Sequence, residues 1–300
     1  MRRIAFLILL YLLNQFYKTA PSSGYTFVDQ FLFTKKYKNP FELENKSFYM
    51  SVKTLDQDDE FTKRTVESVL KFRDYNLFRF SDDECIEVIL KSYVEYFETF
   101  VKLPFGVMKS DFCRYLMIHH FGGIYIDSDV VIERNPIYWI PAVVRKEFEP
   151  DTIQAFIGVE AILPNKYVEY KFYHPYQIVQ WSFAANKGHQ IFRNCMDDIN
   201  DRFINNQTYF NDIHHIIELT GPGAMTRSVL KYLDIPIEDA SIFAEAPILI
   251  KDVYIGPPNT LNCGENDYEG VVYNCNKYTV SHHLYGGRWK EGDLVDGISE

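Results

Sequence analysis

Apolar residues recur along most of the chain with two alternating periods. Short apolar runs predict strands, whereas apolar residues at i, i+3, i+4 and i+7 predict helices. The predicted strands are 47–52, 76–80, 124–126, 153–159, 180–185, 246–250 and 278–281. The predicted helices are 62–72, one stripe through 86–100, 107–121, 188–204 and 223–233. Strands that alternate with helices are typical of α/β proteins, so we expect a single mixed sheet with helices on both faces.

Local signals mark two helix ends. Ser81 is a favourable N-cap, and Glu84 three residues later completes a capping box. Gly122-Gly123 follows the helix at 107–121 and supplies its stop signal.

The N-terminus has a different pattern from the remainder. Arg2-Arg3 precedes the apolar run from Ile4 to Leu13, which is typical of a signal peptide or a short signal anchor within residues 1–17. The run is shorter than the ~20 residues of a full membrane span, and a buried or amphipathic N-terminal helix is the alternative. We interpret residues 18–44 as a stem and residues 45–300 as one catalytic domain. A basic start that stays in the cytosol directs the domain to the lumen.

Composition and charge exclude several classes of protein. Hydrophobic residues make up 47% and charged residues 24%, which excludes long disorder, collagen and coiled coil. The formal net charge is −10, so nucleic acid is not expected as the main partner. A local basic site for a nucleotide diphosphate is still compatible with this charge.

The five cysteines show no C-x-x-C spacing, which argues against a structural zinc site. Cys85, Cys113 and Cys195 lie in apolar helical patterns, so we expect small buried side chains there. Cys263 and Cys275 flank a polar stretch and are the best candidates for a disulfide in an oxidising compartment. Because the number is odd, at least one thiol stays free or pairs with another chain.

Two D-x-D triplets occur, and their contexts differ. Asp56 and Asp58 lie in a polar, acidic stretch that we interpret as a solvated turn. Asp127 and Asp129 follow an apolar strand, at the end where ligands bind in open α/β sheets. Two carboxylates this close are costly unless a cation lies between them or one is protonated, and their oxygens suit Mg²⁺ or Mn²⁺ carrying a diphosphate.

Upstream, Asp111 and Arg114 share one face of a predicted helix. A carboxylate can accept hydrogen bonds from sugar hydroxyls, and a guanidinium can hold a phosphate or a sugar. The alternative is an ordinary ion pair on the protein surface.

Three histidine pairs occur, and one is of chemical interest. His119-His120 is interpreted as a helix end and His214-His215 as part of a partly exposed helix. His282-His283 ends the predicted strand 278–281, where adjacent residues point to opposite faces. Only one of these two imidazoles can therefore face the carboxylates, and we favour His283.

These motifs resemble a known family. Lys109 to Leu116, followed by Gly122-Gly123-Ile124-Tyr125-Ile126-Asp127-Ser128-Asp129, resembles the D-x-D core of glycosyltransferase family 32. Residues 180–189, 220–226 and 282–289 resemble that family's central strand and turn, its T-G-P segment and its C-terminal H-H-x-x-G-S-W motif. Over about residues 75–290 the order and spacing are most similar to the initiation-specific α-1,6-mannosyltransferases.

The resemblance implies a GT-A type fold and a retaining, metal-dependent transfer of mannose from GDP-mannose to an α-mannose of an N-glycan. It implies Mn²⁺ or Mg²⁺ as cofactor, with the ligands Asp127, Asp129 and His283. The residues implied to be catalytic are Asp111, Arg114, Asp127 and Asp129. The residues implied to bind the donor are Asp111, Arg114, Tyr125, Asp127, Ser128 and Trp289, with Arg288 beside Trp289. The residues implied on the acceptor side are Trp181, Thr220, Gly221 and Pro222.

The implied partners are a nucleotide-sugar donor, a glycan acceptor and, through the N-terminal segment, the Golgi or endoplasmic reticulum membrane. Relatives that transfer galactose from UDP-galactose to glycolipid, or mannose from GDP-mannose to inositol phosphoceramide, supply alternatives with the same fold. A catalytically silent binding protein is a further alternative. A two-metal phosphoesterase would need more clustered carboxylates and histidines than this sequence offers.

Two segments depart from the family pattern. Tyr49-Met50-Ser51-Val52-Lys53 replaces the usual His-Gln-x-Trp of the first strand, which the resemblance places by the nucleotide base. Gly287-Arg288 replaces the serine before the C-terminal tryptophan, which removes a hydroxyl group that could help to hold the metal.

Overall fold

The computed structural model describes residues 41–52, 59–141, 144, 152–165, 172–205, 213–263, 274–275 and 278–287. The strands are β1 (Ser47–Ser51), β2 (Asn76–Phe80), β3 (Gly123–Ile126), β4 (Val130–Ile132), β5 (Ala155–Ile162), β6 (Tyr176–Ile178), β7 (Ser182–Ala185), β8 (Ile248–Ile250), β9 (Val253–Gly256) and β10 (Ser281–His283). The α-helices are α3 (Glu60–Leu70), α4 (Asp82–Ser92), α5 (Phe97–Lys102), α6 (Gly106–Phe121), α8 (Gln190–Asn205), α9 (Ile213–Leu219) and α10 (Pro222–Leu233). Short 3₁₀ helices are η1 (Val94–Tyr96), η2 (Pro136–Tyr138) and η3 (Ile237–Glu245).

Several predictions fall outside these ranges. They concern the signal segment 1–17, most of the stem 18–44, the acidic turn with Asp56 and Asp58, and the pair Arg288-Trp289. Within the described ranges, no helix is both long enough and apolar enough to cross a membrane.

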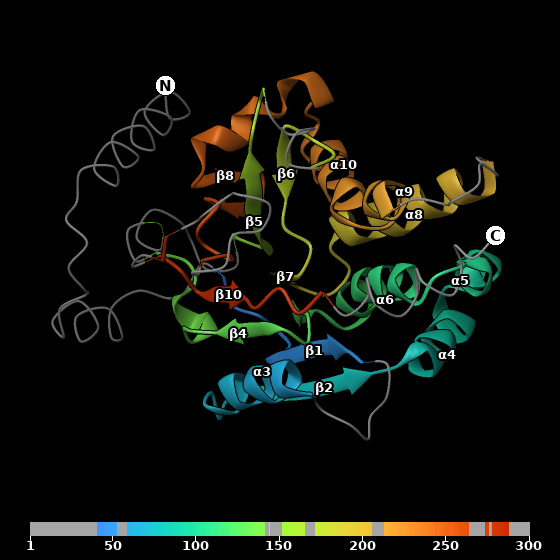
Figure 1. Ribbon diagram of the computed structural model, residues 1–300, viewed down its shortest axis with the longest axis horizontal. Coiled ribbons are helices and arrows are strands. Elements are labelled where there is room, and N and C mark those ends of the chain that lie inside the picture. Colours follow the sequence, from blue (N-terminus) through green and yellow to red (C-terminus); the bar gives the residue numbers. More distant parts are fainter. Residues whose placement is uncertain are drawn as a thin grey trace, which may run out of the picture.

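One mixed sheet organises the described chain (Figure 1). Its strands follow the order β2-β1-β3-β7-β5-β9-β8, with β6 paired to β5. The pairs β2–β1, β1–β3 and β5–β9 are parallel, and β7 runs antiparallel to both β3 and β5. β1, β2, β3, β5 and β9 therefore run in one direction and end at the same edge, where ligands bind in sheets of this type.

Helices cover both faces of the sheet, as predicted. Alternate strand residues point to opposite faces, so Tyr49 and Tyr125 pack with α4, α6, α8 and α10 in one core. Phe48 and Ile126 point the other way and pack in a second core that includes Val69 of α3. The α/β fold expected from the sequence is thereby confirmed.

A second sheet of two strands, β4 and β10, was not expected. In Figure 1 these strands lie side by side beneath the end of β7. His283 pairs with Val130 and Ser281 with Ile132, so the C-terminal strand is Ser281–His283 and the predicted strand 278–281 is misplaced. This pairing brings His283 next to Asp129, which directly precedes β4.

The stripe through 86–100 does not form one helix. α4 ends at Ser92, because the backbone of the C-cap residue Tyr93 (φ −147°, ψ 41°) is not helical, and η1 and α5 follow. Tyr93 turns inward, where its hydroxyl lies 2.8 Å from His119 Nδ1, while Leu90 of the predicted apolar stripe is 54% exposed. The tertiary contact of Tyr93 therefore overrides the sequence periodicity. The predicted capping box of Ser81 and Glu84 at the start of α4 is confirmed.

The cysteine predictions are partly right. Cys263 and Cys275 form the expected disulfide, with sulfur atoms 2.04 Å apart, and Cys195 is free and buried. Cys85 and Cys113 are buried, as predicted, but they also form a second disulfide, which was not predicted and which joins α4 to α6. Both residues are buried, and nothing in the periodicity of either helix shows which faces meet.

The turn between α6 and β3 depends on two glycines. Gly122 and Gly123 adopt φ values of 68° and 109°, which L side chains rarely adopt. A Cβ atom at Gly122 would lie 2.6 Å from Lys187 N, and one at Gly123 would lie 2.6 Å from Ser47 O. This tight packing fixes α6, which carries Asp111 and Arg114, relative to β3, which leads to Asp127.

Candidate active site

A tight turn presents Asp127 and Asp129 at the carboxyl edge of the sheet. The Asp127 amide donates to Trp181 O at 2.8 Å, and the Val130 amide donates to Asp127 O at 3.1 Å. The Thr65 hydroxyl of α3 donates to Ser128 O at 3.1 Å. Hydrogen bonds to Trp181, which precedes β7, within the turn itself, and from Thr65 of α3 therefore hold the turn. The positions of both carboxylates are thus fixed before a ligand binds.

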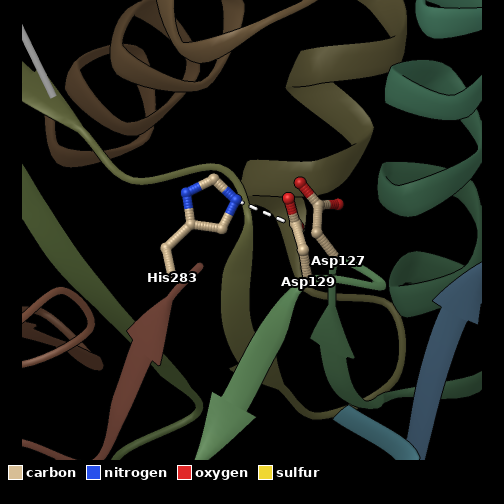
Figure 2. Close-up of side chains that lie close together, drawn as sticks. All are labelled: Asp127, Asp129 and His283. Carbon is tan, nitrogen blue, oxygen red and sulfur yellow. Dashed lines mark hydrogen bonds and ion pairs between the residues drawn. The ribbon is translucent and has the colours of Figure 1, made fainter. Parts of the chain in front are cut away.

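Asp127, Asp129 and His283 converge, and their candidate ligand atoms all lie within 4.8 Å of one another. Figure 2 shows the imidazole directed at the Asp129 carboxylate, with the Asp127 carboxylate next to it. His283 Nε2 lies 3.0 Å from Asp129 Oδ1, and the Gly286 amide donates to Asp129 Oδ2 at 2.9 Å. Two segments distant in sequence, the turn after β3 and the segment that begins with β10, thus contribute to one cluster.

The two adjacent histidines have different environments. His282 Nδ1 lies 2.9 Å from Glu133 Oε1, outside the cluster. The His283 imidazole stacks on Trp181, with ring centroids 4.9 Å apart and planes 7° apart. The alternation of faces along β10 therefore directs only His283 toward the aspartates.

The donor set fits a hard divalent cation. Two carboxylates and one imidazole suit Mn²⁺ or Mg²⁺, and a third carboxylate or a thiolate is absent from this cluster of described residues. Burial by itself lowers the pKa of His283, but Asp129, Asp127 and Glu160 raise it above the ordinary value. The site therefore attracts positive charge, whether a proton or a metal ion.

Asp111 and Arg114 form a buried ion pair. Arg114 Nη2 lies 2.8 Å from Asp111 Oδ1, and their side chains are 5% and 1% exposed. The alternative of a surface ion pair is therefore wrong. Removing either partner alone would leave an uncompensated charge in the interior.

Arg114 connects this pair to the metal cluster. Its Nη1 lies 3.4 Å from Asp127 Oδ1 and donates to Gln180 O at 3.1 Å. The Tyr125 hydroxyl donates to the same Asp127 oxygen at 2.5 Å, and the guanidinium lies over the Tyr125 ring. One guanidinium thus bridges two carboxylates that the sequence places on different elements.

Asp111 and Asp127 share the Arg114 guanidinium, which lowers the pKa of both carboxyl groups but does not cancel the effect of burial. Burial raises the pKa of Asp111 to about 6, although Arg114 and Thr220 lower it. Burial also raises the pKa of Asp127; Arg114 opposes the increase and the charge of Asp129 adds to it. Burial alone would lower the pKa of Arg114, but Asp127 and Asp111 raise it overall. A cation between Asp127 and Asp129 would relieve the repulsion between them.

The segment Thr220-Gly221-Pro222 supports the Asp111 side of the cluster. The Thr220 hydroxyl donates to Asp111 Oδ2 at 2.7 Å. The Tyr115 hydroxyl of α6 lies 3.0 Å from Thr220 O and 3.2 Å from Gly221 O. Gly221 is the N-cap of α10 and Pro222 occupies its first turn. Thr220 is fully buried, and its side chain holds Asp111 in place. The predicted position of Thr220, Gly221 and Pro222 on the acceptor side stays a prediction.

Trp181 stacks on His283, at one end of the cluster of Asp127, Asp129 and His283. Its indole N–H donates to Leu261 O at 3.2 Å. Ser128 contributes its backbone carbonyl to the turn, as described above. The structure does not describe Trp289, so its predicted contact with the donor stays a prediction.

Sequence reasoning missed Glu160. This residue lies near the carboxyl end of β5, is 6% exposed, and receives a hydrogen bond of 2.9 Å from the Gln177 amide. Burial raises its pKa to about 7, opposed by Gln177 and by the charge of His283. The signal was present in the sequence, because Glu160 is the one charged residue of the apolar run Ala155–Ile162.

Comparison with protein families gives a match to the segment that contains most of the cluster. Residues 59–147 match the family described as glycosyltransferase sugar-binding region containing DXD motif. This stretch contains Asp111, Arg114, Asp127 and Asp129. The predicted resemblance to a D-x-D glycosyltransferase family is confirmed over this segment.

Similar proteins include a mannosyltransferase and a mannosyl phosphorylinositol ceramide synthase. An initiation-specific alpha-1,6-mannosyltransferase of Schizosaccharomyces pombe is 27% identical over 65% of this chain and 50% of its own length. A mannosyl phosphorylinositol ceramide synthase of Saccharomyces cerevisiae is 26% identical over 49% of this chain and 42% of its own length. The chain therefore spans about half the length of these relatives. Among solved structures, PaToxG glycosyltransferase is similar with a TM-score of 0.40 and 16% identity, over 67% of this chain and 75% of that chain.

Proposed function

We propose that this protein is a metal-dependent retaining glycosyltransferase that moves mannose from GDP-mannose to an α-mannose of an N-glycan. The observation that carries the proposal is the continuous cluster from Asp111 through Arg114 to Asp127, Asp129 and His283. It combines a divalent-cation site with buried polar groups suited to sugar hydroxyls, at the ligand-binding edge of the sheet. The names of the matched relatives support mannose as the transferred sugar.

Each part of the cluster has a distinct task in this proposal. Asp127, Asp129 and His283 hold Mn²⁺ or Mg²⁺, which offsets the charge of the departing diphosphate when bound. Asp111 and Arg114 orient the mannose of the donor through its hydroxyl groups. Both lie on one helix and are fixed by the disulfide, by Thr220 and by Gln180, so they need little rearrangement when the donor binds.

The chemistry asked of these side chains is mainly orientation. The family resemblance implies retention of configuration, with the acceptor hydroxyl attacking on the face that the nucleotide leaves. No side-chain nucleophile is then required, and holding donor and acceptor in reactive geometry supplies much of the rate. Arg114, shared between Asp111 and Asp127, couples the sugar-orienting group to the metal ligands in one rigid unit.

A second acceptor class has specific support. One matched relative is a mannosyl phosphorylinositol ceramide synthase, so inositol phosphoceramide is the competing acceptor. The donor would be the same and the cluster would act in the same way. UDP-galactose is the competing donor, because the first strand contains Tyr49-Met50-Ser51 where the family usually carries His-Gln-x-Trp.

We also propose a luminal location in the Golgi or endoplasmic reticulum, with anchoring through residues 1–17. The two disulfides of the described chain support an oxidising compartment. The apolar segment that follows Arg2-Arg3 supports entry into the secretory pathway.

A donor screen with the full chain in detergent tests the proposal. The protein is incubated with Mn²⁺ and a panel of GDP- and UDP-sugars, and release of GDP or UDP is measured. We expect release from GDP-mannose that increases when mannosyl glycans are added. Mass spectrometry of products from α-mannosides and from inositol phosphoceramide then identifies the acceptor.

Three outcomes would contradict the proposal. Release of UDP in preference to GDP would change the donor. Binding of nucleotide without release or transfer would favour a catalytically silent binding protein. Hydrolysis of phosphate esters without sugar transfer would favour a phosphoesterase.

A further inference from the structure

His283 has two ring nitrogens, and only one of them faces the aspartates. Nε2 lies 3.0 Å from Asp129 Oδ1, whereas in Figure 2 the other ring nitrogen points away from both carboxylates. This Nδ1 atom is buried and has no hydrogen-bond partner among the described residues. Stacking on Trp181 fixes the ring plane and thus the direction of Nδ1.

A metal ion at the cluster would determine the tautomer of His283. Binding through Nε2 requires that nitrogen to be free of a proton, so the proton of the neutral ring is on Nδ1. A buried N–H group without an acceptor is costly, and histidine ligands of metals almost always donate this proton to a carboxylate, carbonyl or water. The site is therefore incomplete unless an acceptor serves Nδ1.

Glu160 is a buried carboxylate that can accept a hydrogen bond. Its Oε2 accepts a hydrogen bond from the Gln177 amide at 2.9 Å, and the second carboxylate oxygen, Oε1, can accept from another donor. Gln177 is itself oriented, because its carbonyl oxygen accepts from Tyr173 N at 3.1 Å and from His174 N at 3.4 Å. The Gln177 amide therefore donates to Glu160 and holds its carboxylate in place.

Glu160 and His283 are electrostatic neighbours. The charge of His283 lowers the pKa of Glu160, and that of Glu160 raises the pKa of His283. Both β5 and β3 end at the same edge of the sheet, so Glu160 lies at the same level as the turn with Asp127 and Asp129. Asp111, by contrast, has Arg114 and Asp127 as its charged neighbours. Glu160 is thus coupled electrostatically to His283, whereas the charged neighbours of Asp111 are at the other end of the cluster.

We propose that Glu160 is a positioning residue that accepts a hydrogen bond from the Nδ1–H group of His283 through one water molecule, and so prepares Nε2 to bind the divalent metal. This inference rests on the metal site of the proposed function. It adds Glu160 and Gln177 to the residues that determine metal affinity, although neither is a ligand. The carboxylate also increases the basicity of the imidazole and fixes its orientation.

The test compares Glu160→Gln with a matched control in the full chain. Glu160→Gln keeps the volume and the bond from Gln177, but it directs an NH₂ group, a donor, toward the Nδ1–H donor. The control is Glu133→Gln, which removes the carboxylate paired with the neighbouring His282. Mn²⁺ affinity is measured by isothermal titration, without any sugar nucleotide, and thermal stability is measured without metal.

We expect Glu160→Gln to weaken Mn²⁺ binding by about 10- to 100-fold. We expect Glu133→Gln to stay within about twofold of the wild type, since His282 lies outside the cluster. In a His283→Ala background, Glu160→Gln should cause no additional loss, because Glu160 acts through His283. Mn²⁺ affinity of Glu160→Gln equal to that of wild type would overturn the inference, as would an equal loss in the His283→Ala background.

A measurement on the wild type keeps the inference testable if Glu160→Gln fails to fold. Nitrogen-15 NMR of the Mg²⁺-loaded protein should show His283 protonated at Nδ1 and not at Nε2. A proton at Nε2 would overturn the inference. If the wild type transfers sugar with Mn²⁺ but Glu160→Gln binds Mn²⁺ normally, only the inference fails. If the wild type binds no Mn²⁺, the metal site fails and the proposed function with it.

Discussion

The Thr220 hydroxyl donates a 2.7 Å hydrogen bond to the Asp111 carboxylate, although 109 residues separate the two in sequence. Both side chains are buried, and Asp111 is the end of the cluster that we assign to the sugar. Asp111 thus owes its position to α6, which carries it, and to the start of α10, which Thr220 precedes. The segment Thr220-Gly221-Pro222 therefore holds Asp111 through the Thr220 hydroxyl.

Thr220→Val should lower both stability and transfer. The substitution removes a hydrogen bond to a charged, buried group, which should cost about 1.5–3 kcal/mol of unfolding free energy. It should also raise the pKa of Asp111 further, since Thr220 lowers it. We expect kcat to fall by roughly tenfold, as a poorly placed group loses part of its contribution. The control is Thr226→Val on α10, another fully buried threonine, which bonds Ile178 N. Equal losses of kcat in both variants would contradict a specific link to Asp111.

Mn²⁺ should stabilise the wild type against heat, and Asp129→Asn should abolish this effect. At a concentration about 100 times Kd, a ligand of the folded state adds ~2.7 kcal/mol, which raises Tm by roughly 5–10 °C in a domain of this size. Asparagine keeps the volume and an acceptor for the Gly286 amide, so the metal-free fold should persist. Asp252→Asn, at the start of β9 on the opposite edge of the sheet, serves as the control. An undiminished Mn²⁺ shift in Asp129→Asn, measured by differential scanning fluorimetry, would argue against the metal site.

The pKa of Asp111 predicts a defined pH dependence of stability. Burial raises this pKa from 3.8 to about 6, so the folded protein binds the proton more tightly than the unfolded chain does. The contribution of Asp111 to the unfolding free energy is therefore complete below about pH 3.8 and is lost as pH rises through about 6. Asp111→Asn lacks this contribution. We expect the unfolding free energy of wild type, minus that of the variant, to decrease from pH 4 to pH 7 in urea titrations. A difference that increases with pH would mean that Arg114 outweighs burial.

Loss of the Cys85–Cys113 disulfide should destabilise the domain. The bond closes a loop with a sequence separation of 28, for which chain entropy gives roughly 3–4 kcal/mol. It also ties α4 to the helix that carries Asp111 and Arg114. Replacing both cysteines by serine should therefore lower the urea midpoint, and replacing Cys263 with Cys275 should lower it less because that loop is shorter. Two free thiols at Cys85 and Cys113 in the wild type, found by mass spectrometry, would refute the assignment.

Local sequence signals predicted much of the fold and part of the candidate site. The period of the apolar residues gave β2 without error and α6 within one residue, because exposure alternates along most of β2 and the middle of α6 is continuously buried. The D-x-D turn was recognisable, since an apolar strand delivers it to the edge of the sheet. The alternation of strand residues predicted that only one of His282 and His283 faces the carboxylates, and the favoured residue, His283, is the one that does.

Local sequence signals did not predict the contacts between segments that are distant in sequence. β4 and β10 are each three residues long, too short for a recognisable period, and become a sheet only by pairing with each other. The disulfide between Cys85 and Cys113 depends on which faces of two helices meet. The importance of Glu160 depends on His283, which lies 123 residues later in the sequence. In each case the energy comes from a partner that local sequence does not identify.

The final prediction concerns Asp111 and Arg114, because burial changes how their variants must be interpreted. Breaking a buried ion pair costs about 3–5 kcal/mol, which is a large part of the stability of a typical domain. Asp111→Asn is therefore the cleaner variant, since its amide oxygen can still accept from Thr220, whereas Arg114→Lys loses the planar fork that reaches Asp111 and Asp127 together. If these groups orient the sugar, each variant should lose about 2–4 kcal/mol of transition-state stabilisation, a fall in kcat/KM of roughly 30- to 1000-fold. GDP affinity should change little, because GDP lacks the sugar, and this comparison separates the two roles at a temperature where both variants are folded. A decrease in transfer that merely matches a decrease in GDP affinity would assign the pair to the phosphates or to the fold.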